Sequence, residues 1–142
     1  MALRRHKEYT DNLKAVPLFE GLSDRELGFL AGVTTETSVK EGSTLVKQGE
    51  LGQEAMIIEK GTASVTRDGA EIDTIGPGDF FGEMSLINSQ PRNAGVVATS
   101  DMTLLVMDSR EFSSVLDKYP EVAVKILKTV VARLVKAQES TV

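Results

Sequence analysis

Short stretches of alternating apolar and polar residues follow one another from residue 34 to residue 108. Such alternation, over about four to eight residues, is typical of strands that bury one face. The clearest stretches cover residues 43–47, 55–59, 62–66, 70–75, 95–98 and 102–107. Because they are short and evenly spaced, the pattern predicts a small closed or rolled β structure.

Glycines stand between or beside these stretches, where turns need a positive φ. They are Gly42, Gly49, Gly61, Gly69 and Gly76. The pair Asp68-Gly69 is a preferred sequence for a two-residue hairpin turn. We therefore expect an antiparallel hairpin around this pair.

The N-terminal part of the chain carries a helical pattern instead. Residues 1–22 predict a helix and a linker, and Ser23-Asp-Arg-Glu26 is a capping box that begins a second, short helix. Gly32 is placed to end that helix. The buried contacts expected before the capping box are Leu13, Val16, Leu18 and Phe19.

Two more helices are predicted at the C-terminal end, one beginning in Asp108-Ser-Arg-Glu111 and one at Pro120. Apolar residues cover about half the circumference of the last helix, which is wider than the ~100° stripe of an ordinary surface helix. They are Val124, Ile126, Leu127, Val130, Val131, Leu134 and Val135. The helix either lies deep against its own β structure or packs on that structure and on a second copy. We favour a homodimer through residues 120–140.

Composition excludes several classes of site. A chain of 142 residues is long enough for one domain with a real core. Cysteine is absent, and His6 is the only histidine. Thiolate catalysis, cysteine-ligated metals, a two-histidine metal site and a serine–histidine pair are therefore excluded within one chain. We expect no enzyme and no metal.

Charge and hydropathy limit the kinds of partner that the chain is expected to bind and the place where it is expected to act. The net charge is -5, and the basic residues Arg4, Arg5 and Lys7 gather at one end without forming a groove-lining stripe. An acidic chain of this kind is not expected to bind nucleic acid directly. The sequence lacks a run of ~18 apolar residues for a membrane span, and its start lacks the apolar segment of a secretory signal. We expect a cytoplasmic protein.

The most informative segment is Phe81-Gly-Glu-Met-Ser-Leu-Ile-Asn-Ser-Gln-Pro-Arg-Asn-Ala94. It predicts a short helix whose start is surrounded by a carboxylate, a guanidinium and small residues. Gly82 permits close backbone approach, and Arg92 supplies a planar fork of donors suited to phosphate oxygens. Glu83 can accept a hydrogen bond from a hydroxyl. Together they fit a ligand with one negative charge beside a sugar hydroxyl.

The order Phe-Gly-Glu, short apolar helix and Pro-Arg-x-Ala resembles the phosphate-binding cassette of cyclic nucleotide-binding domains, and the spacing from Glu83 to Arg92 is similar to that of kinase regulatory subunits. The resemblance covers nearly the whole chain. It implies an α+β fold, in which an eight-stranded antiparallel, jelly-roll-like β-roll contains a cassette helix and is flanked by N- and C-terminal helices. One domain is expected over residues 1–142, divided into helices (1–33), β-roll (34–108, cassette 81–94) and helices (109–142).

The resemblance also implies roles for single residues. Glu83 takes the ribose 2′-hydroxyl, and Arg92 takes the exocyclic oxygens of the cyclic phosphate. Val65 and Ile72, with Ile75, form an apolar floor under the sugar and base. The other expected contacts, made mainly by backbone and shape, are Phe81, Gly82, Met84, Ser85, Asn93 and Ala94.

The sequence says less about which base the chain binds and about which residue forms the base lid, the group that covers the bound base. In the family, a threonine at position 93 often accompanies a guanine preference, and this chain has Asn93. We therefore expect cyclic AMP, with cyclic GMP as the alternative ligand. Gln138 on the last helix is the candidate to cover the base.

The function that follows is a non-catalytic cyclic nucleotide receptor that regulates an effector protein. The resemblance implies that ligand draws the cassette inward, that Leu86 then meets Phe112, and that the helix over residues 120–140 is re-aimed. The alternative is the sensor part of a catabolite-activator-type transcription regulator, or of a larger signalling protein, without its output domain. An enzyme is disfavoured because Ser85 has no partner base, and a pure oligomerisation scaffold is disfavoured by the intact cassette.

Overall fold

The computed structural model describes residues 2–140, and the side chains of residues 7–138. The chain divides into two compact units, one formed by Met1–Val33 with Phe112–Val142 and the other by Thr34–Glu111. Arg4, Arg5 and His6 lie on the first helix, and their side chains are outside the described range. The expected single domain over residues 1–142 stays a prediction.

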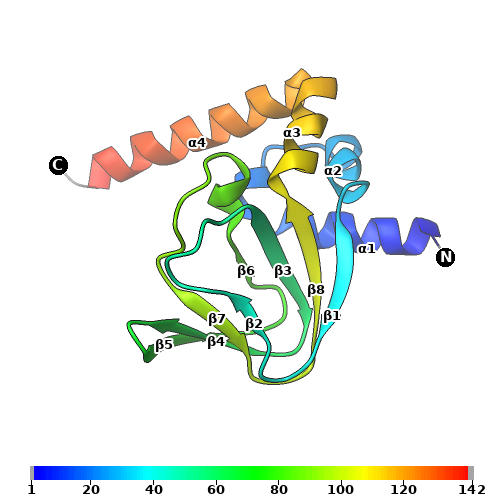
Figure 1. Cartoon of the computed structure of the whole chain (residues 1–142). Coiled ribbons are helices and arrows are strands. Elements are labelled where there is room, and N and C mark those ends of the chain that lie inside the picture. The colour runs from blue at the N-terminus through cyan, green and yellow to red at the C-terminus, as the bar shows by residue number, and fades with distance from the viewer. Residues whose placement is uncertain (1, 141–142) are drawn as a thin grey trace. The chain divides into compact units, whose positions relative to one another are not determined.

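The first unit is helical (Figure 1). Its elements are α1 (Ala2–Lys14), the 3-10 turn η1 (Pro17–Phe19), α2 (Asp24–Ala31), α3 (Ser109–Lys118), which begins in the second unit, and α4 (Pro120–Ser140). Each side chain expected to be buried before the capping box is at most 3% exposed. Phe19 also packs against the fully buried Phe112 of α3, with ring centroids 6.2 Å apart.

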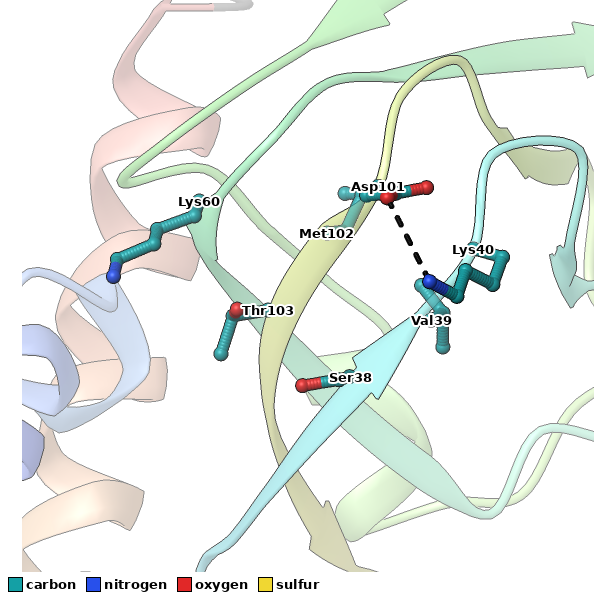
Figure 2. A pocket seen from close by; sticks show the side chains of 7 residues that line it. All are labelled: Ser38, Val39, Lys40, Lys60, Asp101, Met102 and Thr103. Carbon is teal, nitrogen blue, oxygen red and sulfur yellow. Dashed lines mark ion pairs between the residues drawn. The ribbon is translucent and has the colours of Figure 1, made fainter.

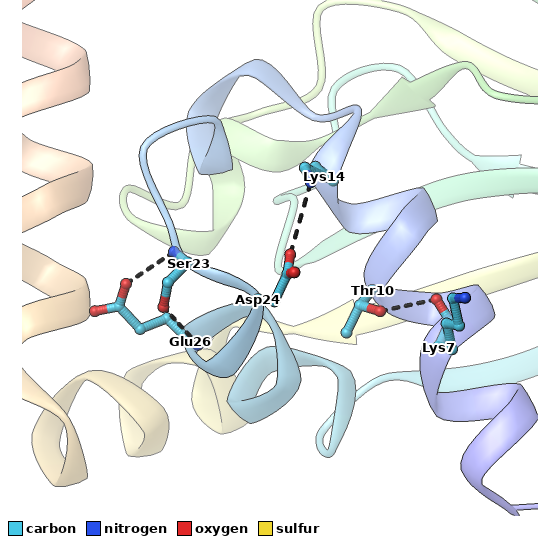
Figure 3. Close-up of polar contacts among 6 residues, drawn as sticks. All are labelled: Lys7, Thr10, Lys14, Ser23, Asp24 and Glu26. Atoms are coloured by element: carbon cyan, nitrogen blue, oxygen red, sulfur yellow. Dashed lines mark hydrogen bonds and ion pairs between the residues drawn. The ribbon is translucent and has the colours of Figure 1, made fainter.

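The predicted capping box is confirmed at the start of α2. Ser23 Oγ accepts from the Glu26 backbone N–H at 3.2 Å, and Glu26 Oε1 accepts from the Ser23 backbone N–H at 2.9 Å. Figure 3 shows both hydrogen bonds beside the exposed ion pair of Lys14 with Asp24, which are 3.6 Å apart. Two N–H groups that lack partners inside the helix are satisfied in this way. The helix ends at Ala31, as Gly32 predicts.

One ion pair joins α2 to α4 within this unit. Lys125 Nζ donates to Glu26 Oε1 at 2.6 Å, and the Glu26 side chain is only 4% exposed. The hydrogen bond from Lys125 lowers the pKa of the Glu26 carboxyl below its ordinary value of 4.5, and that from the Ser23 backbone N–H lowers it further. The carboxylate is therefore held ionised in the core of the unit.

The second unit is built from eight antiparallel strands, which confirms the predicted β-roll. The strands are β1 (Thr35–Val39), β2 (Thr44–Val46), β3 (Glu54–Lys60), β4 (Ala63–Arg67), β5 (Ala70–Ile75), β6 (Phe80–Phe81), β7 (Gly95–Ala98) and β8 (Met102–Asp108). They form two four-stranded sheets with the orders β1-β8-β3-β6 and β2-β7-β4-β5 (Figure 1). The six predicted stretches match β2–β5, β7 and β8 to within one residue at each end.

The core of the roll lies between inward-facing residues of both sheets. Ile58 of β3, Ala63 of β4 and Leu104 of β8 are at most 2% exposed, and they belong to one apolar cluster with Val96 of β7. Apolar side chains on alternate strand positions therefore bring the two sheets together. This packing positions the loops that carry the candidate site.

Two turns show where glycine is required. Asp68 (φ 53) and Gly69 (φ 83) both adopt positive φ, so the hairpin predicted between β4 and β5 is confirmed. The positive φ predicted for Gly76 is wrong, because it occurs at Gly78 (φ 89). Pro77 occupies the second position of this turn, which the Asp79 N–H closes on the Gly76 carbonyl at 3.0 Å. A type II turn, which favours proline at its second position, needs a positive φ and therefore glycine at its third position.

Candidate functional site

The cassette begins with a left-handed glycine. Gly82 follows β6 with φ 81, and residues Glu83–Leu86 then form the short 3-10 helix η2. A Cβ added to Gly82 would lie 2.5 Å from both Arg92 Nη1 and the Glu54 carbonyl oxygen. Both the backbone conformation and this close approach exclude a larger residue.

The segment that carries Arg92 is hydrogen-bonded to the loop before β3. The Arg92 backbone N–H donates to the Glu50 carbonyl at 2.8 Å, and the Gly49 N–H donates to the Arg92 carbonyl at 2.8 Å. Leu51 and Pro91 form an isolated antiparallel bridge between these segments. Residues 49–52 therefore act as a partner strand that sets the position of the Arg92 backbone.

The guanidinium of Arg92 lies between backbone segments of Gly52 and Gly82. Nη2 donates to the Glu54 carbonyl oxygen at 2.8 Å, and Nη1 donates to Ser85 Oγ at 3.2 Å. A Cβ on Gly52 would lie 2.5 Å from Ser85 Oγ and 2.6 Å from Arg92 Cζ. We call Gly52 and Gly82 together the glycine clamp, because a side chain on either one would displace the guanidinium.

The charge of Arg92 is not neutralised by direct contact. Its hydrogen-bond acceptors are a carbonyl and a hydroxyl, and it forms no ion pair among the described residues. Burial lowers the pKa of Arg92, while the negative charges of Glu54 and Glu83 act in the opposite direction. An arginine nonetheless stays protonated in proteins. The guanidinium is therefore a positive charge in a fixed orientation, with neutral groups as its hydrogen-bond acceptors.

The other predicted cassette residues lie around this cation. Glu83 opens η2 and is half-buried, and Ser85 is 8% exposed. Phe81 is half-buried on β6, where it pairs with Met56 of β3. Met84 is 61% exposed, so its side chain points away from the buried part of the cassette. The structure thus brings Gly82, Glu83, Ser85 and Arg92 together.

Asn93 and Ala94 connect Arg92 to β7. The carbonyl of Asn93 accepts from Arg67 Nε at 3.0 Å, so the backbone here is tied to the end of β4. The Asn93 side chain is exposed, and Ala94 is half-buried. Asn93 is therefore accessible to a ligand, while its main chain is already held.

The predicted apolar floor lies on β4 and β5. Val65 is half-buried and pairs with Val96 of β7, the strand that follows Ala94. Ile72 lies at the register shift between β4 and β5 and is 50% exposed. An extra residue in one strand of a pair is a β-bulge, which re-aims a side chain. Ile75 is half-buried near the end of β5.

Two hollows of the β unit differ in their relation to the cassette. One, of about 220 Å³, is lined by Arg92 and Glu54 together with residues of β2 and the loop before β3. The other, of about 390 Å³, lies at the ends of β1 and β8 (Figure 2). Its Lys40–Asp101 ion pair spans 4.0 Å, and both side chains are at least 70% exposed. We assign no site to this second hollow, whose charged groups are already in solvent.

The described residues contain no membrane span or metal cluster. Within residues 2–140, every helix falls short of the length and apolarity that crossing a bilayer requires. Among the described side chains, no three histidine, aspartate or glutamate residues gather in a metal-binding arrangement. Gln138 is exposed on α4, in the helical unit. Its role as a base lid stays a prediction.

Two contributors to the site were absent from the sequence-based prediction. They are Gly52, which makes room for the guanidinium, and the Glu54 carbonyl, which accepts from it at 2.8 Å. The sequence signal that was available is the spacing of Gly49 and Gly52 just before a strand. That spacing indicates close backbone approach, but it does not identify the approaching group.

Known proteins resemble this chain in sequence and structure. The cAMP-dependent protein kinase type II regulatory subunit of Drosophila melanogaster is 31% identical over 140 residues, which cover 95% of this chain and 37% of that protein. The cGMP-dependent protein kinase, isozyme 2 forms cD5/T2, of the same organism is 35% identical over 128 residues, covering 84% and 14%. The chain therefore spans little more than a third of the one relative and a smaller part of the other.

A solved structure agrees with the fold. The crystal structure of the N-terminal domain of a transcriptional regulator from Streptomyces coelicolor A3(2) has a TM-score of 0.83 and 29% sequence identity, and the match covers 92% of this chain and 95% of that one. A sequence profile described as "Cyclic nucleotide-binding domain" matches residues 36–119, a range that includes the cassette and the glycine clamp. This match spans more than half of the chain, so the protein belongs to the cyclic nucleotide-binding domain family.

Proposed function

We propose that this chain is a non-catalytic receptor for cyclic AMP, which it binds with the cassette of residues 81–94. The main support for the proposal is the environment of Arg92. Its guanidinium lies in the glycine clamp and donates to two neutral acceptors. Two of its five N–H groups are used in this way, so donors remain for phosphate oxygens. A fixed cation loses little conformational freedom when the anion binds.

Glu83 explains why the ligand should be a cyclic nucleotide and not an open one. A carboxylate beside a phosphate is unfavourable unless the carboxylate accepts a hydrogen bond from the ligand. The ribose 2′-hydroxyl supplies that donor, and a cyclic phosphate carries one negative charge. A 5′-monophosphate carries more negative charge at neutral pH, so it meets stronger repulsion from Glu83.

The preference for adenine rests on position 93. This chain has Asn93, which is exposed, where a threonine often accompanies guanine preference in the family. Relatives named for each cyclic nucleotide are similar to this chain, so similarity alone does not choose the base. We expect cyclic AMP to bind more tightly than cyclic GMP, and an Asn93→Thr variant to raise the affinity for cyclic GMP relative to cyclic AMP.

The deciding experiment is titration calorimetry with cyclic AMP, cyclic GMP, their 2′-deoxy forms and 5′-AMP. Wild type should bind cyclic AMP, and the 2′-deoxy form and 5′-AMP should each bind at least about tenfold more weakly. Arg92→Ala should lose about a hundredfold or more in affinity. The matched control is Arg133→Ala, which removes an exposed arginine of the helical unit and should bind like wild type. Equal binding by Arg92→Ala, or no binding by wild type, overturns the proposal.

We further propose that binding is transmitted through Phe112 to α4. Phe112 is fully buried in α3 and packs on Phe19, so any shift of its ring changes the packing of the helical unit. The chain has no cysteine, so Lys136→Cys places a single spectroscopic label on α4. Ligand should change the label's environment in wild type, and that change should shrink in Phe112→Leu, which preserves more of the core than Phe112→Ala. An undiminished response in both variants contradicts this transmission.

A second candidate is the sensor part of a larger regulator. It is favoured by the similarity to the N-terminal domain of a transcriptional regulator, which this chain matches over 95% of that domain. The two candidates share the ligand site and differ only in the output. Determining the genomic reading frame around the sequence separates them, since a regulator of this kind requires a DNA-binding module in the same protein.

A further inference from the structure

The hairpin formed by β4 and β5 has few neighbours that hold it in place. β5 is the last strand of its sheet, and five of its six residues are exposed (Figure 1). A Cβ added to Gly69, at the tip of the hairpin, would meet no other atom within 4 Å. Elements with few buried contacts are the least stable parts of a fold. The position of this hairpin therefore depends on the hydrogen bonds made near its turn.

One tether joins the turn to the chain just after β2. Gln48 Nε2 donates to Asp68 Oδ1 at 2.9 Å, and the Asp68 backbone N–H donates to Gln48 Oε1 at 2.9 Å. A backbone N–H can only donate, so the amide oxygen must face it, and the amide nitrogen is then left for the carboxylate. The side chain of Gln48 thus binds the turn at two points and in one orientation.

A second tether joins the end of β4 to the cassette. Arg67 Nε donates to the Asn93 carbonyl at 3.0 Å. The Arg92 carbonyl, one residue earlier, accepts from the Gly49 N–H at 2.8 Å, and Gly49 directly follows Gln48. The cassette is thereby hydrogen-bonded to both of the segments that the first tether joins.

The two tethers close a ring of three chain segments, which we call the hairpin brace and define by the residues whose side chains close it: Gln48, Arg67 and Asp68. The brace connects the two parts of the proposed ligand site. The cassette carries Arg92, the cation for the phosphate, and the hairpin carries Val65 and Ile72, the expected apolar floor for the base. Val65 lies two residues before Arg67 on β4, so the two share one face of the strand. The second tether is thus made from the strand face that holds part of the floor.

We propose that the hairpin brace positions the base floor relative to Arg92, and so determines how much affinity a cyclic nucleotide gains from its base. Gln48 and Arg67 are positioning residues, because they act on the ligand through the hairpin. The proposal deepens the proposed function and rests on it. A nucleotide must satisfy both ends of the site at once, so a floor at the wrong distance from the phosphate loses its contacts with the base.

Two ligands separate the base from the rest of the nucleotide. Cyclic AMP reaches both ends of the site, whereas the methyl riboside of ribose cyclic phosphate has the same phosphate and ribose and lacks a base. In wild type, cyclic AMP should bind at least about tenfold more tightly, and this ratio is the contribution of the base. Calorimetry measures the affinity for cyclic AMP, and NMR titration measures the weaker affinity for the base-free ligand.

Arg67→Met removes the donor of the second tether and keeps most of the apolar stem. It should lower the affinity for cyclic AMP by about five- to twentyfold, the range expected for the loss of a hydrogen bond from a charged donor. The affinity for the base-free ligand should change by less than about twofold. Arg133→Met, which removes an exposed arginine of the helical unit, is the matched control and should leave both affinities unchanged. Arg67 is exposed, so thermal unfolding should show that the variant stays folded.

An exchange of side chains tests the first tether. Gln48→Glu brings a second carboxylate against Asp68, so it should lower the affinity for cyclic AMP about as much as Arg67→Met does. Adding Asp68→Asn lets the new carboxylate accept from both the side-chain amide and the backbone N–H of position 68, and affinity should return to within about twofold of wild type. Asp68 has φ 53, a conformation that asparagine also adopts. A residue that only filled space would not show this reciprocal rescue.

The contrary results are distinct from one another. Equal weakening of both ligands by Arg67→Met would mean that the tether orients the cassette itself, which overturns the role in base binding. Unchanged affinity for cyclic AMP in both Arg67→Met and Gln48→Glu would mean that the hairpin needs no brace. A double variant that binds no better than Gln48→Glu would mean that Gln48 does not act through Asp68. All three require a wild type that binds cyclic AMP, whereas a wild type that binds neither ligand overturns the proposed function and the role of the brace with it.

Discussion

Two cations, one in each compact unit, hold segments that are far apart in the sequence, and they do so with different partners. Lys125 binds a nearly buried carboxylate, Glu26, at 2.6 Å. Arg92 binds the Glu54 carbonyl at 2.8 Å and Ser85 Oγ at 3.2 Å, and both acceptors are neutral. The charge of Lys125 is therefore satisfied within the protein. The charge of Arg92 is oriented by neutral groups of the protein, and we propose that it interacts with the phosphate of a ligand.

We infer from this difference that Lys125 is a structural cation and that Arg92 is a ligand-binding one. When one residue of a buried ion pair is removed, the other is left as an uncompensated charge. The ion pair therefore acts mainly on stability. A cation with neutral acceptors is positioned at modest cost, and its main electrostatic interaction is made with an incoming anion. Whether the acceptor is charged or neutral, more than the number of hydrogen bonds, thus indicates which arginine or lysine belongs to a ligand-binding site.

The largest expected effects come from replacing each cation by methionine. Lys125→Met should lower the free energy of unfolding by about 2–4 kcal/mol, since it leaves Glu26 charged and buried. It should leave the affinity for cyclic AMP almost unchanged. Arg92→Met should do the reverse, with a loss of about 1 kcal/mol or less in stability and about a hundredfold or more in affinity. Chemical denaturation and calorimetry measure the two quantities.

The double variant Glu26→Gln with Lys125→Met is the control for this pair. It removes both charges, so it should recover part of the stability that Lys125→Met loses. If Lys125→Met instead abolished ligand binding in a folded protein, the separation of the two roles would be wrong.

A smaller effect is expected from the glycine clamp. The added Cβ of Gly52→Ala would lie within 2.6 Å of Arg92 Cζ and Nε, so the guanidinium must move. We expect affinity for cyclic AMP to fall by about 10–100-fold, the range given by overpacking of a tight site. Gly76→Ala is the matched control, because its Cβ would meet nothing nearer than 3.9 Å and its φ is not positive. Equal effects of the two substitutions on binding would contradict the clamp.

Which features were predictable from the sequence depends on how local their cause is. The alternation along β4 and β5 and the cassette motif are contained in short segments, so the pattern identified them. β1 was not identified, because four of its five residues are exposed and no alternation marks it. β6 has only two residues, too few to show an alternating pattern.

The supporting contacts of the site depend on distant parts of the chain. The Glu54 carbonyl reaches Arg92 across 38 residues, and Glu26 reaches Lys125 across 99. A backbone carbonyl has no side-chain signature, and any acidic residue in the chain is an equal candidate for a lysine. The residues that we propose to bind the ligand could therefore be predicted from local motif and spacing, whereas the groups that position them required the three-dimensional fold.

The acid dependence of stability sharpens the contrast between the two cations. The pKa of Glu26 in the folded protein lies below its ordinary value of 4.5, because Lys125 and the Ser23 backbone N–H stabilise the carboxylate. The unfolded chain therefore takes up a proton first as the pH falls, and the stabilisation is present above pH 4.5 and lost below it. Thermal unfolding at several pH values should show the advantage of wild type over Glu26→Gln shrinking as the pH falls below that value. An advantage that is independent of pH would mean that Glu26 acts through packing and not through its charge.

The smallest expected effect is that of Ser85→Ala. The hydrogen bond from Arg92 Nη1 to Ser85 Oγ is the longer of the two, at 3.2 Å, and the Glu54 carbonyl and both glycines would still hold the guanidinium. Ser85 is 8% exposed, and alanine fits the same space. Calorimetry with cyclic AMP should therefore show a loss of only about two- to fivefold, because the remaining contacts keep the cation in place. A loss above about thirtyfold would mean that the hydroxyl is essential for orienting the cation, or that it binds the phosphate itself. The site would then depend on its side-chain acceptor as much as on the backbone that surrounds Arg92.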